Sequence, residues 1–206
     1  TTTGTAEWNA GEPLRLHPDL PKGIFRQVTA ELDWPMEDGE RLFMNGYQTW
    51  TYSPELGKTD RLRGVDQIPK FLTKKYAFDR YGDYHFVSYG KEPGTSHGFS
   101  YCTFRKGDQY KLLASLDDRP GYTIFHYSAK EARLTLERDC AGIRHRGGPY
   151  AIFDLFRAEG TEDAVYDGWF DAMGVKPRTK EKLAGYSSWY NHYQNITNLG
   201  VEADFK

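Results

Sequence analysis

Aromatic and hydrogen-bonding side chains are concentrated near the end of the sequence, in the stretch Gly185-Tyr-Ser-Ser-Trp-Tyr-Asn-His-Tyr-Gln-Asn-Ile-Thr197. A buried structural strand would consist mostly of Val, Ile and Leu, and this stretch does not. Aromatic faces can stack on the C–H surface of a ligand, while amides and hydroxyls bond its hydroxyl groups. The composition therefore suits a polar, ring-shaped ligand. The alternative is an ordinary aromatic-rich core strand followed by a turn.

A second stretch with the same chemistry lies much earlier, at Phe43-Met-Asn-Gly-Tyr-Gln-Thr-Trp-Thr-Tyr-Ser-Pro54. The pair Asn45-Gly46 is typical of a turn that needs positive φ. We therefore expect Tyr47 to Trp50 to lie on or beside a loop, where the Trp50 ring could contact a ligand. Without a ligand, Trp50 would be a half-buried residue of a sandwich.

Taken together, the two stretches resemble the α-galactosidases of glycoside hydrolase family 36 (melibiases), over about Phe43 to Thr197. In that family the first motif lies in an N-terminal β-supersandwich domain of the galactose-mutarotase type, and the second is the first strand of a (β/α)8 barrel. The resemblance implies a retaining hydrolase that acts on α-galactosides. It also implies a sugar pocket lined by Trp189 and Tyr190, with Asn191 nearby, which Trp50 reaches from a sandwich loop.

Composition limits the other classes of protein. The chain has 206 residues, a net charge of −2 and a pI near 6.3, which gives no electrostatic case for nucleic acid or an anionic membrane. No apolar run approaches the roughly 18 residues of a membrane span, and the first residues are not a signal peptide. The two cysteines, Cys102 and Cys140, are expected to be buried thiols of a cytoplasmic protein, although a disulfide between neighbouring strands is the alternative.

Residues 1–158 are predicted to form a mainly β domain, because short alternating runs are separated by turn residues. Hairpins in series indicate an antiparallel sandwich with Greek-key connections. Residues Tyr110 to Leu116 are expected to pair with Tyr122 to Tyr127 across an Asp-Asp-Arg-Pro-Gly turn. The other expected strands are Ile24 to Leu32, Asp83 to Tyr89, Phe99 to Phe104, Ala132 to Arg138 with Leu134 and Leu136 facing the core, and a central strand over Tyr150 to Phe156.

A helix and a connector are predicted at residues 159–182, followed at 183–206 by the start of a truncated barrel. Thr161 is a plausible N-cap, and Gly174 stands where a left-handed C-cap belongs. Val165, Trp169, Ala172 and Met173 fall on one face of this helix. The triplet Asp167-Gly-Trp169 resembles part of a family sugar-binding motif, but its place in the helix favours packing. The barrel strand is expected to begin near Leu183.

The sequence offers no catalytic residues. The six histidines lack metal-ligand spacing, so we expect no metal and no cofactor, and no pair of acidic residues can be assigned as acid and nucleophile. The resemblance places both catalytic aspartates on later barrel strands, and the 206 residues are then expected to be inactive alone. The alternatives are a non-catalytic carbohydrate-binding β-sandwich and a mutarotase-type epimerase, which needs a histidine–carboxylate pair. The expected partner is an α-galactoside, and a homo-oligomer stays open.

Overall fold

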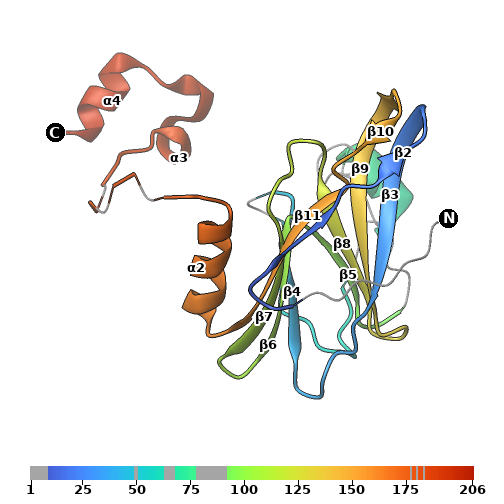
Figure 1. The fold of residues 1–206 in the computed structure, drawn as a ribbon. Helices are drawn as coiled ribbons and strands as arrows, with labels where there is room; N and C mark the ends of the chain where they lie inside the picture. Colours follow the sequence, from blue (N-terminus) through green and yellow to red (C-terminus); the bar gives the residue numbers. More distant parts are fainter. Residues whose placement is uncertain are drawn as a thin grey trace. The chain divides into compact units, whose positions relative to one another are not determined.

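The computed structural model describes residues 9–48, 51–62, 68–77, 92–176, 178–179, 181–182 and 184–206. The chain forms two compact units, Thr1–Val175 and Lys176–Lys206. The first unit is mainly antiparallel β-sheet, as the alternating sequence pattern predicted (Figure 1).

Two sheets face each other in the first unit and their strands are antiparallel. The first sheet has the order β1 (Pro13–Leu16), β11 (Phe153–Gly160), β7 (Gln109–Ser115), β6 (Tyr101–Lys106), β4 (Arg41–Met44). The second has the order β3 (Gly23–Asp33), β9 (Arg133–His145), β8 (Thr123–Ser128), β5 (Thr95–Phe99). A small pair joins β2 (Asp19–Leu20) to β10 (Gly148–Pro149), and a short helix, α1, spans Lys70–Lys75.

The main core lies between the two sheets and follows the period of two that strands impose. Leu134 and Leu136 of β9 are buried, as predicted, and Phe104 of β6 meets Tyr127 of β8 with ring centroids 5.3 Å apart. Cys102 and Cys140 are free, buried thiols, as expected. These contacts between side chains of both sheets make the first unit a β-sandwich.

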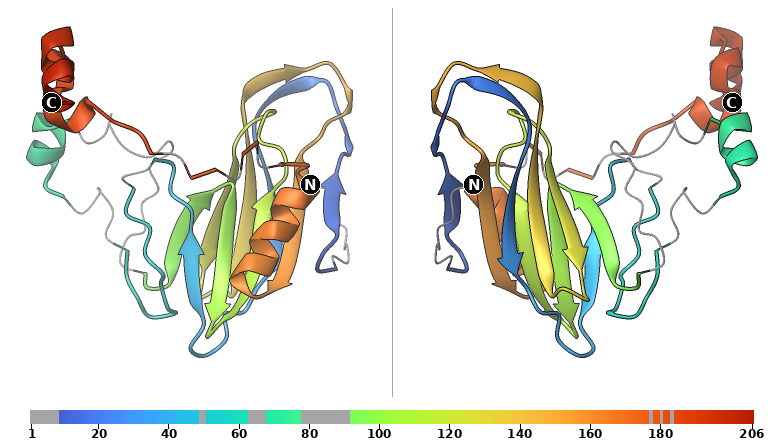
Figure 2. Two further views of the ribbon diagram at one scale, coloured as in Figure 1. Left: turned by 90° about the vertical axis from the view of Figure 1, so that its left-hand side faces the viewer. Right: turned by 90° about the vertical axis from the view of Figure 1, so that its right-hand side faces the viewer.

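A second, smaller core lies on the outer face of the first sheet, where α2 (Glu162–Ala172) covers β7 and β11 (Figure 2). Val165 and Trp169 are buried there, and the Trp169 indole N–H donates to the carbonyl of Ser115 at 2.9 Å. The packing role expected for Trp169 is confirmed. Gly174 has a φ of +69° after the helix, which matches its predicted C-cap position, whereas Ala172 is exposed rather than packed.

Two strand predictions were wrong. The run Phe99 to Phe104 is divided at Ser100, which has a φ of +65° and carries the chain from β5 in one sheet to β6 in the other. The runs around β7 and β8 do not pair as a hairpin, because β7 belongs to the first sheet and β8 to the second. The Asp-Asp-Arg-Pro-Gly segment therefore crosses from one sheet to the other. Its Asp118 side chain accepts hydrogen bonds from Ser100 and Thr123.

The remaining predicted strands differ less. Ile24 to Leu32 and Ala132 to Arg138 correspond to β3 and β9, and β9 continues to His145. The central strand β11 starts at Phe153, three residues later than Tyr150, and runs on to Gly160. The predicted strand Asp83 to Tyr89 lies outside the described residues.

The second unit differs from the barrel strand expected from Leu183 onward. Its described residues form α3 (Trp189–His192), a 3-10 turn (Tyr193–Asn195) and α4 (Asn198–Asp204), and they contain no strand. A parallel barrel strand needs hydrogen-bonding neighbours, and the described residues of this unit supply none. The backbone instead bonds locally, for example from His192 N to Ser188 O at 2.8 Å. Within the described part of the chain, no helix is long and apolar enough to cross a membrane.

Candidate functional site

A pocket of about 380 Å³ lies at one end of the sandwich and includes part of the early aromatic motif. This volume falls within the range of small-molecule sites. The lining residues come from three separate parts of the chain: the segment after β4, the corner between β5 and β6, and the segment before β8. They are Asn45, Gly46, Tyr47, Phe99, Ser100 and Tyr122.

Three aromatic rings form the wall of this pocket. Phe99 is buried, whereas Tyr47 and Tyr122 are 37% and 38% exposed and so present ring surface to solvent. The ring centroid of Tyr47 lies 5.2 Å from that of Phe99 and 5.5 Å from that of Tyr122. The ring planes of Tyr47 and Tyr122 cross at 84°. The Tyr47 and Tyr122 hydroxyls are 3.1 Å apart, and this hydrogen bond raises the pKa of Tyr122.

Asn45 supplies the amide of the pocket and is fixed on both sides. Its backbone N–H donates to the carbonyl of Tyr101 at 3.3 Å, and its own carbonyl accepts from the N–H of Phe99 at 2.8 Å. Its side-chain Nδ2 donates to the Phe99 carbonyl at 2.9 Å. The Asn45 carboxamide is therefore held in one orientation at the edge of the pocket.

Gly98 allows the close approach that brings Asn45 beside Phe99. A Cβ atom at Gly98 would lie 2.8 Å from the Asn45 carbonyl oxygen and 2.8 Å from the Met44 Cβ. Real Cβ atoms do not approach backbone so closely without a shift of the chain. The end of β4 can therefore cross β5 only because position 98 has no side chain.

The four residues predicted to bind a sugar divide between the second unit and a position that the structure does not describe. Trp50 lies outside the described residues, although Tyr47 of the same motif lines the pocket. Trp189, Tyr190 and Asn191 all belong to α3 in the second unit. That Trp50 and Trp189 face one pocket stays a prediction.

Within the second unit, two of the predicted residues have defined partners. Trp189 is 54% exposed and stacks on Tyr193 with centroids 4.8 Å apart, whereas Tyr190 is 87% exposed. Asn191 Nδ2 donates to both oxygens of Asp204, at 2.9 Å and 3.0 Å. The described structure thus leaves the rings of α3 accessible and engages the Asn191 amide locally.

The Asp204 carboxylate is the centre of the second unit. It accepts hydrogen bonds from the Tyr186 hydroxyl and the Asn191 amide, and His192 Nε2 lies 2.6 Å from its Oδ2. The bonds from Tyr186, then from His192 and Asn191, lower the pKa of Asp204. This arrangement ties the N-terminal part of the unit to the end of α4.

Phe99, Ser100 and Tyr122 were not predicted as site residues. Phe99 and Ser100 were predicted as the first two residues of a strand, and Tyr122 as the first residue of a hairpin partner. The available indication was the Pro-Gly pair before Tyr122, which marks an irregular segment. Nothing local in the sequence shows that this segment returns to the Asn45-Gly46 turn.

Other polar groups gather elsewhere on the first unit. A second pocket, of about 220 Å³, is lined by charged groups that include Glu37, Glu40 and Lys111. Lys111 Nζ lies 2.7 Å from Glu37 and 3.1 Å from the buried Glu40, so these charges compensate one another. Among the described residues, no group of three or more His, Cys, Asp or Glu could hold a metal ion.

Histidine–carboxylate pairs, which the sequence alone did not indicate, are present. His126 Nε2 lies 2.9 Å from Glu137 on neighbouring strands, and His97 stacks on His126 with centroids 6.1 Å apart. His17 lies 2.7 Å from Asp154. His126 and Glu137 flank the buried positions Phe125 and Leu136, so they lie on the face of β8 and β9 turned away from the main core.

The sequence was also compared with known proteins. The chain matches no protein-family model, and a search of curated proteins finds no match for it. A functional assignment therefore depends on the geometry of the pocket and on the two aromatic motifs.

Proposed function

We propose that this chain binds a sugar ring in the pocket lined by Asn45, Tyr47, Phe99, Ser100 and Tyr122. The observation that carries the proposal is the position of Tyr47. The sequence resemblance assigns its motif, Asn45 to Trp50, to a loop that reaches a sugar pocket. In the structure Tyr47 is a half-exposed ring beside a fixed amide and a second tyrosine.

The chemistry of the lining supports a neutral polyhydroxylated ligand. Tyr47 and Tyr122 offer ring faces for the C–H surface of a pyranose and hydroxyls that can both donate and accept. The Asn45 side-chain oxygen can accept a hydrogen bond, and the tyrosine hydroxyls can donate or accept one. None of the six lining residues carries a formal charge, so an ionic ligand would gain no ion pair from them.

The wider assignment depends on the resemblance. We propose that the chain is the N-terminal part of a retaining α-galactosidase-like hydrolase of the cytoplasm. The sandwich would carry part of the sugar pocket, and Trp50, Trp189, Tyr190 and Asn191 would contact the same α-galactoside. Hydrolysis would then require two aspartates on barrel strands that these 206 residues do not include.

A non-catalytic carbohydrate-binding sandwich is the second candidate. It is favoured by one observation, that all six lining residues of the pocket belong to the first unit. A binding module needs nothing more than such a pocket, whereas an enzyme needs the second domain. Both candidates share sugar binding, so binding is tested first.

The test is a calorimetric titration of the 206-residue protein with methyl α-galactoside. A dissociation constant of about 1 mM corresponds to roughly 4 kcal/mol, a reasonable value for a single open monosaccharide site. Tyr47→Ala and Tyr122→Ala should each weaken binding by about tenfold or more, the loss that about 1.4 kcal/mol produces. Tyr52→Ala is the matched control, because Tyr52 is 77% exposed and does not line the pocket.

Two results separate the outcomes. Wild-type protein that binds none of methyl α-galactoside, methyl α-glucoside and methyl α-mannoside would contradict the sugar site. Preference for the galactoside over the other two supports the α-galactosidase-like assignment, whereas equal binding favours the binding module. The same protein should release no 4-nitrophenol from an aryl α-galactoside under either candidate.

A further inference from the structure

A buried polar cluster lies directly behind the proposed sugar pocket, and its centre is the Asp118 carboxylate. Oδ2 accepts a hydrogen bond from the Ser100 hydroxyl at 2.6 Å. Oδ1 accepts from the Ser115 hydroxyl at 2.8 Å, and from the Thr123 hydroxyl and backbone N–H at 2.7 Å and 3.1 Å. The Asp118 side chain is only 27% exposed, so these donors replace most of its water.

The residues bound to Asp118 come from both sheets. Ser115 ends β7 in the first sheet, and Thr123 begins β8 in the second. Ser100 is the corner between β5 and β6, where the chain changes sheets. One carboxylate thus joins the corner at Ser100 to both ends of the crossing from β7 to β8.

Ser100 is held in a conformation that its own backbone does not favour. Its φ of +65° lies in the left-handed region, which costs a residue with a Cβ on the order of 1 kcal/mol or more. Its N–H donates to the Thr123 carbonyl at 2.9 Å, and its carbonyl accepts from Ser115 N–H at 2.7 Å. The bond from its hydroxyl to Asp118 is the third restraint on the same residue.

The other wall of the pocket is restrained by the same cluster. Tyr122 stands between Gly121 and Thr123, and Thr123 is bound to Asp118. The buried Arg138 donates to the carbonyls of Gly121 and, at 3.1 Å, of Asp117. Arg138 Nη1 also lies 3.5 Å from Asp118 Oδ1, so the guanidinium and the carboxylate fix the 117–123 segment from the inside.

From these contacts we infer that Asp118 is a positioning residue for the sugar pocket. Asp118 is not among the residues that line it. It sets the separation between Ser100 and Tyr122, and through the Tyr122 hydroxyl it sets the position of Tyr47. This inference rests on the proposed sugar-binding function, because the pocket is the structure that Asp118 holds.

The neighbouring Asp117 provides a matched control. Its carboxylate binds Arg119 Nη2 at 2.8 Å and Arg119 N–H at 2.9 Å, and the Arg119 side chain is 91% exposed. Asp117→Asn and Asp118→Asn therefore make the same chemical change one residue apart. Only the second change reaches Ser100 and Thr123.

The experiment measures the dissociation constant for methyl α-galactoside together with the ring-carbon NMR signals of Tyr47 and Tyr122. Asp118→Asn should weaken binding by roughly tenfold, the loss that one or two hydrogen bonds produce. It should also move both sets of tyrosine signals at temperatures well below the melting point. Asp117→Asn should change neither readout.

Two further variants keep the inference falsifiable. Thr123→Val keeps the shape of the side chain and deletes only its hydroxyl bonds, so it tests the cluster if Asp118→Asn fails to fold, with an expected loss of about threefold. Leu134→Val lowers the stability of the buried core at a residue that does not line the pocket, and should leave the tyrosine signals in place. If the tyrosine signals merely reported a general loss of stability, Leu134→Val would move them as Asp118→Asn does.

The outcomes are distinct. Sugar binding by wild-type protein with unchanged affinity in Asp118→Asn and Thr123→Val overturns the inference alone. Absence of any sugar binding by wild-type protein overturns the proposed function, and the inference with it. Equal losses in Asp117→Asn and Asp118→Asn also contradict a specific role for Asp118.

Discussion

The Tyr47 and Tyr122 hydroxyls meet at 3.1 Å although the residues are 75 positions apart in the sequence. Tyr47 follows β4 of the first sheet, and Tyr122 precedes β8 of the second. Their hydrogen bond therefore closes the end of the sandwich where the pocket lies. Phe99 packs against both rings, which helps to keep the pair together.

The hydroxyl pair predicts a measurable coupling between the two tyrosines. Tyr47→Phe and Tyr122→Phe should each lower the free energy of unfolding by up to about 1 kcal/mol, because one net hydrogen bond is lost. The double variant should lose less than the sum of the two, since the bond can be lost only once. A double-mutant cycle from urea unfolding measures this coupling, and strict additivity would show that the hydroxyls do not interact in solution.

Gly98→Ala should damage the sandwich and the pocket together. The added methyl would lie 2.8 Å from the Asn45 carbonyl oxygen, so the end of β4 must move. Overpacking of this kind typically costs about 1–3 kcal/mol. Thermal unfolding measures the loss, and Gly23→Ala is the control, because its nearest contact would be an ordinary 3.7 Å from Phe25. A Gly98→Ala protein as stable as the control variant would contradict the close approach.

Trp169→Ala should destabilise the first unit without an effect on sugar affinity. Trp169 is buried between α2 and the first sheet and donates its indole N–H to Ser115 O. Truncation of a buried Trp costs roughly 3–5 kcal/mol. Phe170→Ala, at a 42% exposed neighbour, should cost far less. The comparison uses urea unfolding for stability and calorimetry for binding, and a selective loss of binding would give Trp169 a ligand role instead.

The sequence predicted the individual strands better than it predicted the connections between them. The strands with strict alternation, such as the one that contains Leu134 and Leu136, were predicted because alternation reports burial of one face. The predicted β7–β8 hairpin was wrong, because adjacency in sequence does not distinguish a turn within one sheet from a crossing between two sheets. The crossing is held by contacts between residues well apart in the sequence, such as Asp118 with Ser100 and Arg138 with the carbonyl of Ile152.

The candidate site shows the same division. The early motif contains Asn45 and Tyr47, which line the pocket, and its Asn-Gly turn beside aromatics is a local pattern that can be seen in the sequence. Phe99, Ser100 and Tyr122 were missed, because the pocket depends on the corner at Ser100 and on the close approach at Gly98. The late motif predicted a strand from its resemblance, whereas in the structure its residues satisfy their backbone bonds within a short helix.

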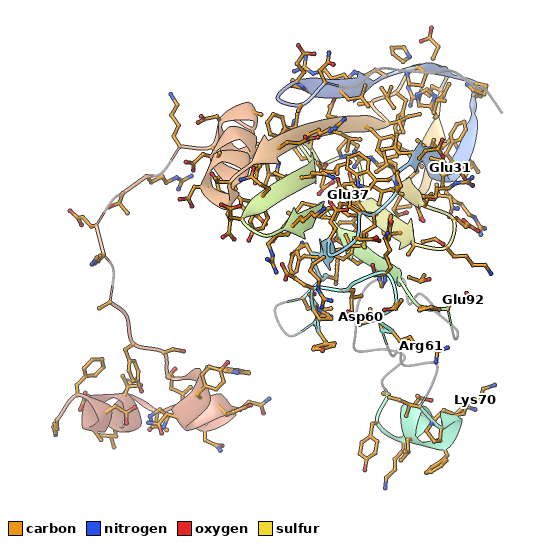
Figure 3. All side chains as sticks on the ribbon, turned by 90° about the horizontal axis from the view of Figure 1, so that it is seen from below. Glu31, Glu37, Asp60, Arg61, Lys70 and Glu92 are labelled. Atoms are coloured by element: carbon orange, nitrogen blue, oxygen red, sulfur yellow. The ribbon has the colours of Figure 1, made fainter. Side chains whose placement is uncertain are left out.

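The ion pairs of Glu37 should make the protein less stable in acid. This carboxylate, labelled in Figure 3, accepts hydrogen bonds from Lys111 and Lys106, which lower its pKa from the ordinary 4.5 to about 2. A lowered pKa means that the folded state favours the charged form. Its contribution is therefore present above pH 4.5 and lost as the pH falls toward about 2.

The measurement compares wild-type protein with Glu37→Gln by thermal unfolding at several pH values. Near neutral pH the variant should melt slightly lower, and the difference should shrink between pH 4.5 and about 2. The effect should be small, because Glu37 is half exposed and water screens the pairs. It should weaken further in high salt, and a pH-independent difference would show that the ion pairs are not its cause.

The second unit depends on Asp204, which leads to the last prediction. Asp204 binds Tyr186, Asn191 and His192. Trp189 and Tyr193 of the same unit pack against each other and remain largely exposed. No described residue of this unit is buried. A cluster of polar bonds therefore carries a larger share of its order than in the sandwich, where side chains are excluded from water.

Asp204→Asn should release α3 from α4 and speed the cleavage of the second unit by chymotrypsin at its aromatic residues. The new amide can no longer accept from three donors as a carboxylate does, and it places a donor against Asn191 and His192. Glu202→Gln is the matched control, because it neutralises an exposed carboxylate on the same helix. The pKa of Asp204 is lowered from its ordinary 3.8, so the charged form is favoured, and wild-type protein should approach the Asp204→Asn behaviour as the pH falls below 3.8. Limited proteolysis at neutral pH, with Trp189 fluorescence followed through acid, measures both effects, and equal cleavage of the two variants would remove Asp204 from the role assigned to it.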